Sequence, residues 1–148
     1  MPFVFRYQKV LDVREKQQHS LEVELARCER AVLAGRADVA RWEGIRQDVL
    51  TQLQTARQDG DVEQNAYGTA YLRHVRRSLA RSRQSVAERE KQRDGARARL
   101  VEAVKACKAL QKYREKMEAE YLAAEERADE RTVELHTARA HMRAGGTL

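Results

Sequence analysis

Apolar residues recur along this chain at alternating steps of three and four. Starting from Val4, these steps reach sixteen positions up to Ala56, and twelve of them are apolar. A random placement in a chain that is 42% hydrophobic would give about seven. Restarted at Leu72, the same steps reach Met142 with sixteen apolar residues in twenty-one positions. A sustained 3.5-residue period predicts long helices that wind into a left-handed supercoil.

The pattern is interrupted between Gln58 and Asn65. Gly60 suits the left-handed residue just past a helix end, and Asp61 with Gln64 has the spacing of an N-cap and its capping-box partner. Gly68 and Thr69 offer a second start, so the second helix begins between 62 and 70. We place the elements as a first helix at about 3–58, a turn at about 59–69, a second helix at about 70–143 and a frayed tail at 144–148.

Two such arms joined by a short turn predict an all-α fold, a long two-helix antiparallel coiled-coil hairpin with unequal arms that forms a single domain. If paired residue numbers sum to 128, Trp42 meets Val86 and Gly35 faces Arg93. A register that sums to 121 is compatible with a tighter turn, and both remain open. The longer second helix should extend roughly 20 residues past the first, leaving Leu135 and Met142 without a partner inside the hairpin.

Composition narrows the class of protein further. With 5% aromatic residues and 35% charged residues, the chain cannot fill a thick globular core. No apolar run approaches the roughly 20 residues of a membrane-spanning helix, and the first residues lack the pattern of a secretory signal. Two cysteines are no disulfide framework, which favours a reduced cytoplasmic setting, and the net charge of +6 favours acidic partners.

The sequence offers no constellation for catalysis, so we expect no enzyme, cofactor or metal site. There is no glycine-rich phosphate loop, and the carboxylates fall on predicted solvent faces. Cys28 and Cys107 lie on the seam as small buried residues; the 128 register separates them too far for a disulfide, whereas a sum of 135 would align them. The four histidines show no zinc-ligand spacing: His19, His74, His136 and His141.

Two surface features invite a functional interpretation. The stretch from Ala66 to Ala87 has no acidic residue, and its arginines include the i, i+4 stripe Arg73, Arg77 and Arg81. This basic stripe is either chance composition, a protein-docking surface or a phosphate-binding one. The cluster Phe3, Val4, Phe5 and Tyr7 is either a cap on the hairpin end or an apolar plug for a partner.

Three stretches of sequence resemble one known family. The opening reads Phe3-x-Phe5-Arg6-Tyr7-Gln8-Lys9-Val10-Leu11-Asp12-x-Arg14-Glu15 and is similar to the start of the flagellar export protein family FliJ. Tyr71-Leu72, followed by Val75 and Leu79, resembles the start of that family's second helix. The stretch from Lys112 to Arg127 also fits, and the resemblance covers nearly the whole chain.

The resemblance implies a soluble, non-enzymatic stalk of the flagellar type III export apparatus. Its partners would be a hexameric export ATPase, whose ring it enters and activates, an export-gate membrane protein and export chaperones. It would be cytoplasmic and peripherally associated with the inner membrane, as a monomeric hairpin or weak homodimer. The implied gate contact is Tyr71, Leu72, Val75 and Ser78. The implied ATPase-ring contact is Phe3, Phe5, Arg6, Gln8, Arg127, Arg131 and Arg139.

Two alternative functions remain. The first is the equivalent stalk of a virulence type III secretion injectisome. The second is a basic coiled coil that binds nucleic acid, although no nucleic-acid partner is expected, because Glu interleaves with Arg along most of the chain and no aromatic stacking platform accompanies the arginines.

Overall fold

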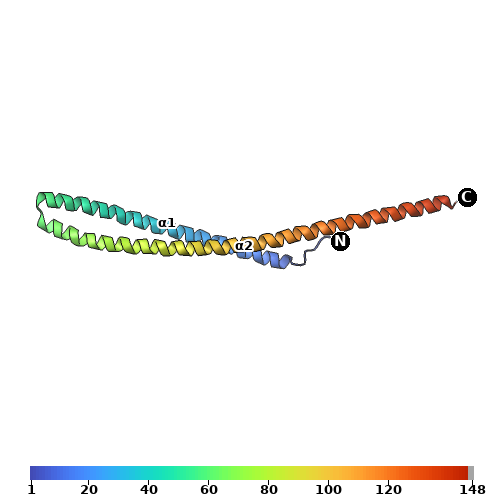
Figure 1. Ribbon diagram of the computed structural model, residues 1–148, viewed down its shortest axis with the longest axis horizontal. Helices are drawn as coiled ribbons and strands as arrows, with labels where there is room; N and C mark the ends of the chain where they lie inside the picture. Colours follow the sequence, from blue (N-terminus) through green and yellow to red (C-terminus); the bar gives the residue numbers. More distant parts are fainter. Residues whose placement is uncertain (147–148) are drawn as a thin grey trace. The chain divides into compact units, whose positions relative to one another are not determined.

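The structure is a computed structural model that describes residues 1–146, and it consists of two α-helices joined by a tight turn (Figure 1). Helix α1 spans Gln8–Asp59 and α2 spans Val62–Gly145. No strand occurs in this part of the chain. The predicted all-α antiparallel hairpin is therefore confirmed. The chain divides into two units, described separately below: a hairpin unit, His19–Glu102, and a terminal unit, Met1–Gln18 with α2 from Ala103 onward.

The turn at Gly60 and Asp61 is closed by backbone hydrogen bonds on both sides. The Gly60 N–H donates to the Arg57 carbonyl (3.3 Å) and the Asp61 N–H to the Ala56 carbonyl (2.9 Å), the bond pattern of a Schellman helix end. Gly60 has φ of 68°, a conformation that only glycine adopts without strain. Asp61 then caps α2, because its carboxylate accepts the Gln64 backbone N–H at 3.1 Å.

The predicted element boundaries need three corrections. The turn does not extend over 59–69, because capping by Asp61 starts α2 at Val62 and Gly68 and Thr69 are helical. The first helix does not begin at residue 3: residues 1–5 are non-helical and α1 starts at Gln8. Ala144 and Gly145 belong to α2 rather than to a frayed tail. The end of the predicted tail, residues 147–148, lies outside the described residues.

The core of the hairpin unit is a narrow apolar seam between α1 and α2. Val49, Leu53, Leu72 and Val75 form its buried cluster, with Trp42 and Ile45 packed against it. The predicted seam positions of α1 from Leu21 to Ala56 are all buried or half-buried, which confirms the heptad in this unit. At one arginine of the seam the backbone supplies a partner: the Arg89 guanidinium donates to the Ala31 carbonyl at 2.8 Å.

Close contacts at two glycines identify the register. A Cβ added to Gly68 would lie 2.6 Å from a methyl of Leu53, and one added to Gly35 would lie 3.0 Å from a methyl of Val86. Both pairs of residue numbers sum to 121, so the 121 register is the correct one and the 128 register is wrong. Gly35 therefore faces Val86 and Arg89 rather than Arg93, and the Trp42 ring lies 6.0 Å from that of His74.

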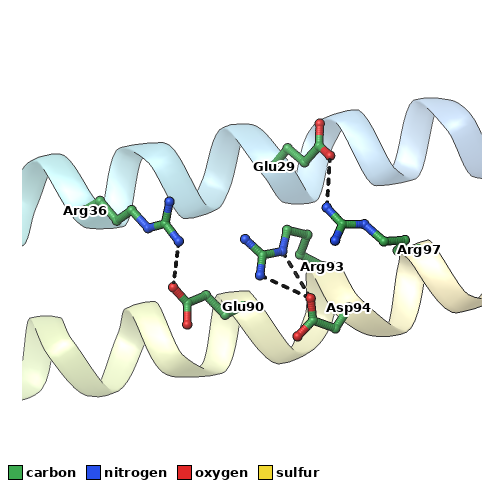
Figure 2. A network of polar contacts seen from close by, with 6 residues as sticks. All are labelled: Glu29, Arg36, Glu90, Arg93, Asp94 and Arg97. Carbon is green, nitrogen blue, oxygen red and sulfur yellow. Dashed lines mark hydrogen bonds and ion pairs between the residues drawn. The ribbon is translucent and has the colours of Figure 1, made fainter.

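Ion pairs connect α1 and α2 along the margins of the seam. Figure 2 shows Arg36 with Glu90 at 2.9 Å and Glu29 with Arg97 at 3.8 Å, whereas Arg93 pairs within α2 with Asp94. A third bridge joins Arg83 to Glu43 at 3.1 Å. Exposed pairs of this kind contribute at most about 1 kcal/mol each. Their main effect is on specificity, because sliding one helix by a heptad would separate all three.

Substitution of two helical glycines tests the packing at the seam. Gly44 has open space around its position, so Gly44→Ala should raise the free energy of unfolding by about 0.5–1 kcal/mol through helix propensity. Gly68→Ala should instead lower it, because the new methyl would overlap the buried Leu53 side chain. Urea unfolding followed by circular dichroism measures both; equal stabilisation by the two variants would contradict the 121 register.

Candidate interaction surfaces

The N-terminal segment is held against α2 by aromatic side chains. Phe5 is buried, and its ring centroid lies 6.0 Å from that of Tyr113 and 5.9 Å from that of Tyr7. The Phe3 ring lies 5.6 Å from that of Tyr121. Tyr113 and Tyr121 are eight residues apart, so they share one face of α2. The predicted cluster therefore acts as a cap within the terminal unit, although Val4 in the middle of it is exposed.

The first residue completes this contact through polar groups. The Tyr121 hydroxyl lies against the Met1 carbonyl oxygen and 2.6 Å from the Glu125 carboxylate. The terminal amino group of Met1 lies 3.9 Å from the same carboxylate. Hydrogen bonding to Glu125, and then desolvation, raise the pKa of the Tyr121 phenol, because ionisation would place two negative charges together.

The predicted ATPase-ring residues divide into packed and exposed groups. Phe3 and Phe5 are occupied by the aromatic contacts of the terminal unit. Gln8 donates to Asp12 at 2.9 Å within the first turn of α1. Arg6 is exposed, with its guanidinium carbon 5.7 Å from the centroid of the Tyr7 ring. The three remaining members are exposed on α2: Arg127, Arg131 and Arg139.

The last part of α2 has no helix against its seam. Every residue from 124 to 146 is exposed. Leu135 and Met142, which continue the apolar period of α2, expose 60% and 78% of their surface, and Val133 exposes 64%. This end of the helix carries an apolar stripe that is open to a partner, as the sequence predicted.

The predicted gate residues are also divided by burial. Leu72 and Val75 belong to the hairpin core and are almost fully buried. Tyr71 is exposed and stacks on His74 with ring centroids 6.1 Å apart, and Ser78 is half-buried. Only Tyr71 and Ser78 therefore offer side chains to a partner at this place, with Leu72 and Val75 fixing the backbone beneath them.

The basic stripe lies on the solvent side of α2 in the hairpin unit. Arg73, Arg77 and Arg81 are exposed, and none of them has an acidic side chain within ion-pair distance among residues 1–146. Arg83 of the same acid-free stretch is neutralised by Glu43. The stripe is thus a local excess of positive charge.

Titratable groups form no metal site in the part of the chain that the structure describes. Cys28 and Cys107 are free and buried, and they lie in different units. The Glu24 pKa is lowered chiefly by the hydrogen bond from Arg27 one turn away, an exposed pair within α1.

Sequence reasoning missed two groups of residues. Tyr113 and Met117 complete the aromatic cluster, and the spacing of Tyr113, Met117 and Tyr121 at i, i+4 and i+8 was the available signal. Leu50 and Arg57 line a groove near the turn, which required the register to be known first.

These features define a class of protein: a long antiparallel coiled-coil hairpin with exposed apolar and basic surfaces. Comparison with protein families gives a match to the flagellar FliJ protein over residues 3–146. The chain therefore belongs to the FliJ family, and it is a component associated with flagellar protein export, in a family whose role in the export apparatus is non-catalytic. Comparisons with curated proteins and with solved structures gave no match. No helix within residues 1–146 is long and apolar enough to cross a membrane.

Removal of the Glu125 charge tests the contact at Tyr121. The pKa of Tyr121 in the folded chain is raised above its ordinary value of 10.0. The protonated phenol therefore stabilises the fold fully below pH 10.0, and this stabilisation is lost as the pH rises through the raised pKa. Glu125→Gln should lower the pKa of one tyrosine in an ultraviolet absorbance titration. Glu126→Gln is the matched control and should leave the titration unchanged; identical curves for wild type and Glu125→Gln would contradict the contact.

Proposed function

We propose that this chain is the stalk of the flagellar export ATPase. In this function the terminal unit enters the ring of a hexameric export ATPase, promotes its assembly and activity, and connects it to the export gate and to export chaperones. The chain itself hydrolyses nothing: it positions the ring and favours one of its states, and that state in turn binds the stalk more tightly. The proposal also includes peripheral association with the inner membrane through these partners, as a monomer or weak homodimer.

The observation that carries the proposal is the uncovered seam of α2. In the hairpin unit the seam residues Leu72, Val75 and Leu79 are buried against α1, whereas Leu135 and Met142 continue the same period without a partner in the described chain. Covering an apolar side chain of this size is worth about 1.5–3 kcal/mol. A ring with an apolar and acidic inner surface would supply that cover.

The charges around the exposed stripe suit such a ring. Arg127, Arg131 and Arg139 extend into solvent from the same part of α2, and Arg6 extends from the N-terminal segment. Phe3 and Phe5 support this surface from within, because they hold the N-terminal segment on α2. In this proposal the arginines contact the ring, and the phenylalanines hold the N-terminal segment in position on α2.

The gate contact belongs to the hairpin unit. Tyr71 and Ser78 lie on the accessible part of α2 near the turn, and Leu72 and Val75 anchor that part of the helix in the core. Because this surface and the ring surface belong to different units, two different partners can use them. Chaperones would have to bind elsewhere on the same hairpin.

Polar substitution of the open seam tests the ATPase contact. Leu135→Ser combined with Met142→Ser should weaken binding to the export ATPase of the same organism by at least about ten-fold, because both are large apolar contacts. ATP hydrolysis by the ATPase, measured with and without each purified chain, should lose its stimulation in the double variant. The exposed pair Leu33→Ser and Val23→Ser, in the hairpin unit, is the matched control and should stimulate normally.

The wild-type chain itself provides the decisive measurement. Absence of both a complex and stimulation at low salt would refute the ring contact. Binding to DNA or RNA at low salt that is lost when Arg73, Arg77 and Arg81 are changed to Gln would instead favour the nucleic-acid function.

A further inference from the structure

A groove lies beside the turn, on one flank of the hairpin unit. Its volume is about 680 Å³, and it lies between the end of α1 and the beginning of α2. Leu53 and Leu72 form its floor, and Leu50, which is partly exposed, forms an apolar edge. Arg57 from α1 and Arg76 from α2 line it as well. We call it the tip groove.

The charge at this groove belongs to one flank. Each residue of a helix is turned about 100° from the one before it. Going round α2 from the floor residue Leu72 in one direction, Arg76 comes first, then Arg73 and then Arg77. Tyr71 and Ser78 lie in the opposite direction from Leu72. Arg73, Arg76 and Arg77 are exposed, and within residues 1–146 none of them is in an ion pair. Arg76 therefore lines the tip groove, and Arg73 and Arg77 continue the positive charge from it round α2 toward the solvent side.

The opposite flank carries charge of the other sign. A smaller hollow there, about 310 Å³, is lined by Asp59 and Asp61 together with uncharged residues. On the groove side, Glu43 is already paired with Arg83 at 3.1 Å. The two flanks of the hairpin tip thus differ: the larger hollow is apolar and cationic, and the smaller one is acidic.

We infer that the tip groove docks an acidic amphipathic helix of another protein. Leu50 and Arg57 are two turns apart, about 10 Å along α1, which matches the spacing of apolar anchors at i, i+3 or i+4, and i+7 on a helix laid in a groove. The leucines of the floor receive those anchors. The carboxylates beside them face Arg57 and Arg76, and such complementarity selects the partner and speeds its association.

A protein fits this site better than the other anionic ligands. Nucleic acid would leave the apolar floor unused, and the exposed Tyr71 that could stack on a base lies on the other flank. A lipid surface is flat, whereas Leu53 and Leu72 are recessed and reachable only by an inserted side chain. The inference is independent of the proposed ring contact, because the tip groove belongs to the hairpin unit and the ring contact to the terminal unit. The groove shares Leu72 with the proposed gate contact, whose exposed residues Tyr71 and Ser78 lie on the other flank.

A designed peptide serves as the probe. It is a labelled helical peptide with leucine at i, i+3 and i+7 and glutamate beside them, and fluorescence anisotropy measures its binding to the full chain. Binding should weaken as salt rises, since the contact is partly electrostatic. The triple variant Arg73→Gln, Arg76→Gln, Arg77→Gln should lower the affinity by at least about ten-fold. Leu50→Gln should lower it too without disturbing the fold, because Leu50 is at the rim.

A second triple variant controls for net charge. Arg30→Gln, Lys91→Gln, Arg99→Gln removes the same number of exposed cations elsewhere in the hairpin unit and should change the affinity less than about two-fold. A peptide with its leucines replaced by serine should not bind. Equal losses in the two triple variants would overturn the inference, as would failure of the wild-type chain to bind the acidic peptide at low salt.

Two further measurements distinguish other occupants. If single-stranded DNA or anionic vesicles displace the peptide and bind more tightly through Arg73, Arg76 and Arg77, the site takes phosphate and the inference is wrong. If sedimentation shows that the wild-type chain self-associates and the first triple variant does not, the occupant is a second copy of this chain. The inference is supported if the labelled peptide is displaced from the chain by other acidic amphipathic helices and by neither DNA nor vesicles.

Discussion

The structure of the hairpin unit depends on the turn at Gly60 and Asp61. Because two residues suffice to end α1 and cap α2, residue pairs across the seam sum to 121, and each seam contact follows from that number. In this register Gly68 accommodates Leu53 and Gly35 accommodates Val86. The cross-helix pairs, such as Arg36 with Glu90, then meet without adjustment. A longer turn that shifted the register to a sum of 128 would set Gly35 against Arg93 instead of Val86.

That seam explains why the hairpin suits a protein that works with partners. Its buried residues include Ala56, Ala96 and Cys28, which remove little apolar surface from water. The seam also admits Arg89, which is tolerated because the Ala31 carbonyl accepts its hydrogen bond. A coiled coil of this composition is only moderately stabilised by its own contacts. Partners that bind the folded hairpin add stability by mass action.

The heptad was readable from the sequence, and details that depend on contacts between the arms were not. Periodicity predicted the buried residues of α1 from Leu21 onward and the uncovered Leu135 and Met142, since each is a local property of one helix. It did not decide the register, because sums of 121 and 128 align the same heptads. Gly68 was interpreted as part of the turn, although its role is to make room for Leu53. For the cluster with Phe3 and Phe5 the sequence left both a cap and a plug for a partner open, because the choice depends on Tyr113 and Tyr121 lying against it.

Burial changes what the candidate site residues can do. A residue such as Val75, which has no exposed surface, cannot contact a gate protein directly, so its effect on binding must pass through the backbone of α2 and through Tyr71 and Ser78. The same reasoning separates Phe5, which shapes the terminal unit, from Arg131, which is free to reach a partner. Since a two-helix coil buries only one stripe of each helix, the remaining faces stay available. Different flanks of one short segment, such as the Tyr71 and Arg76 sides of α2, can therefore serve different partners.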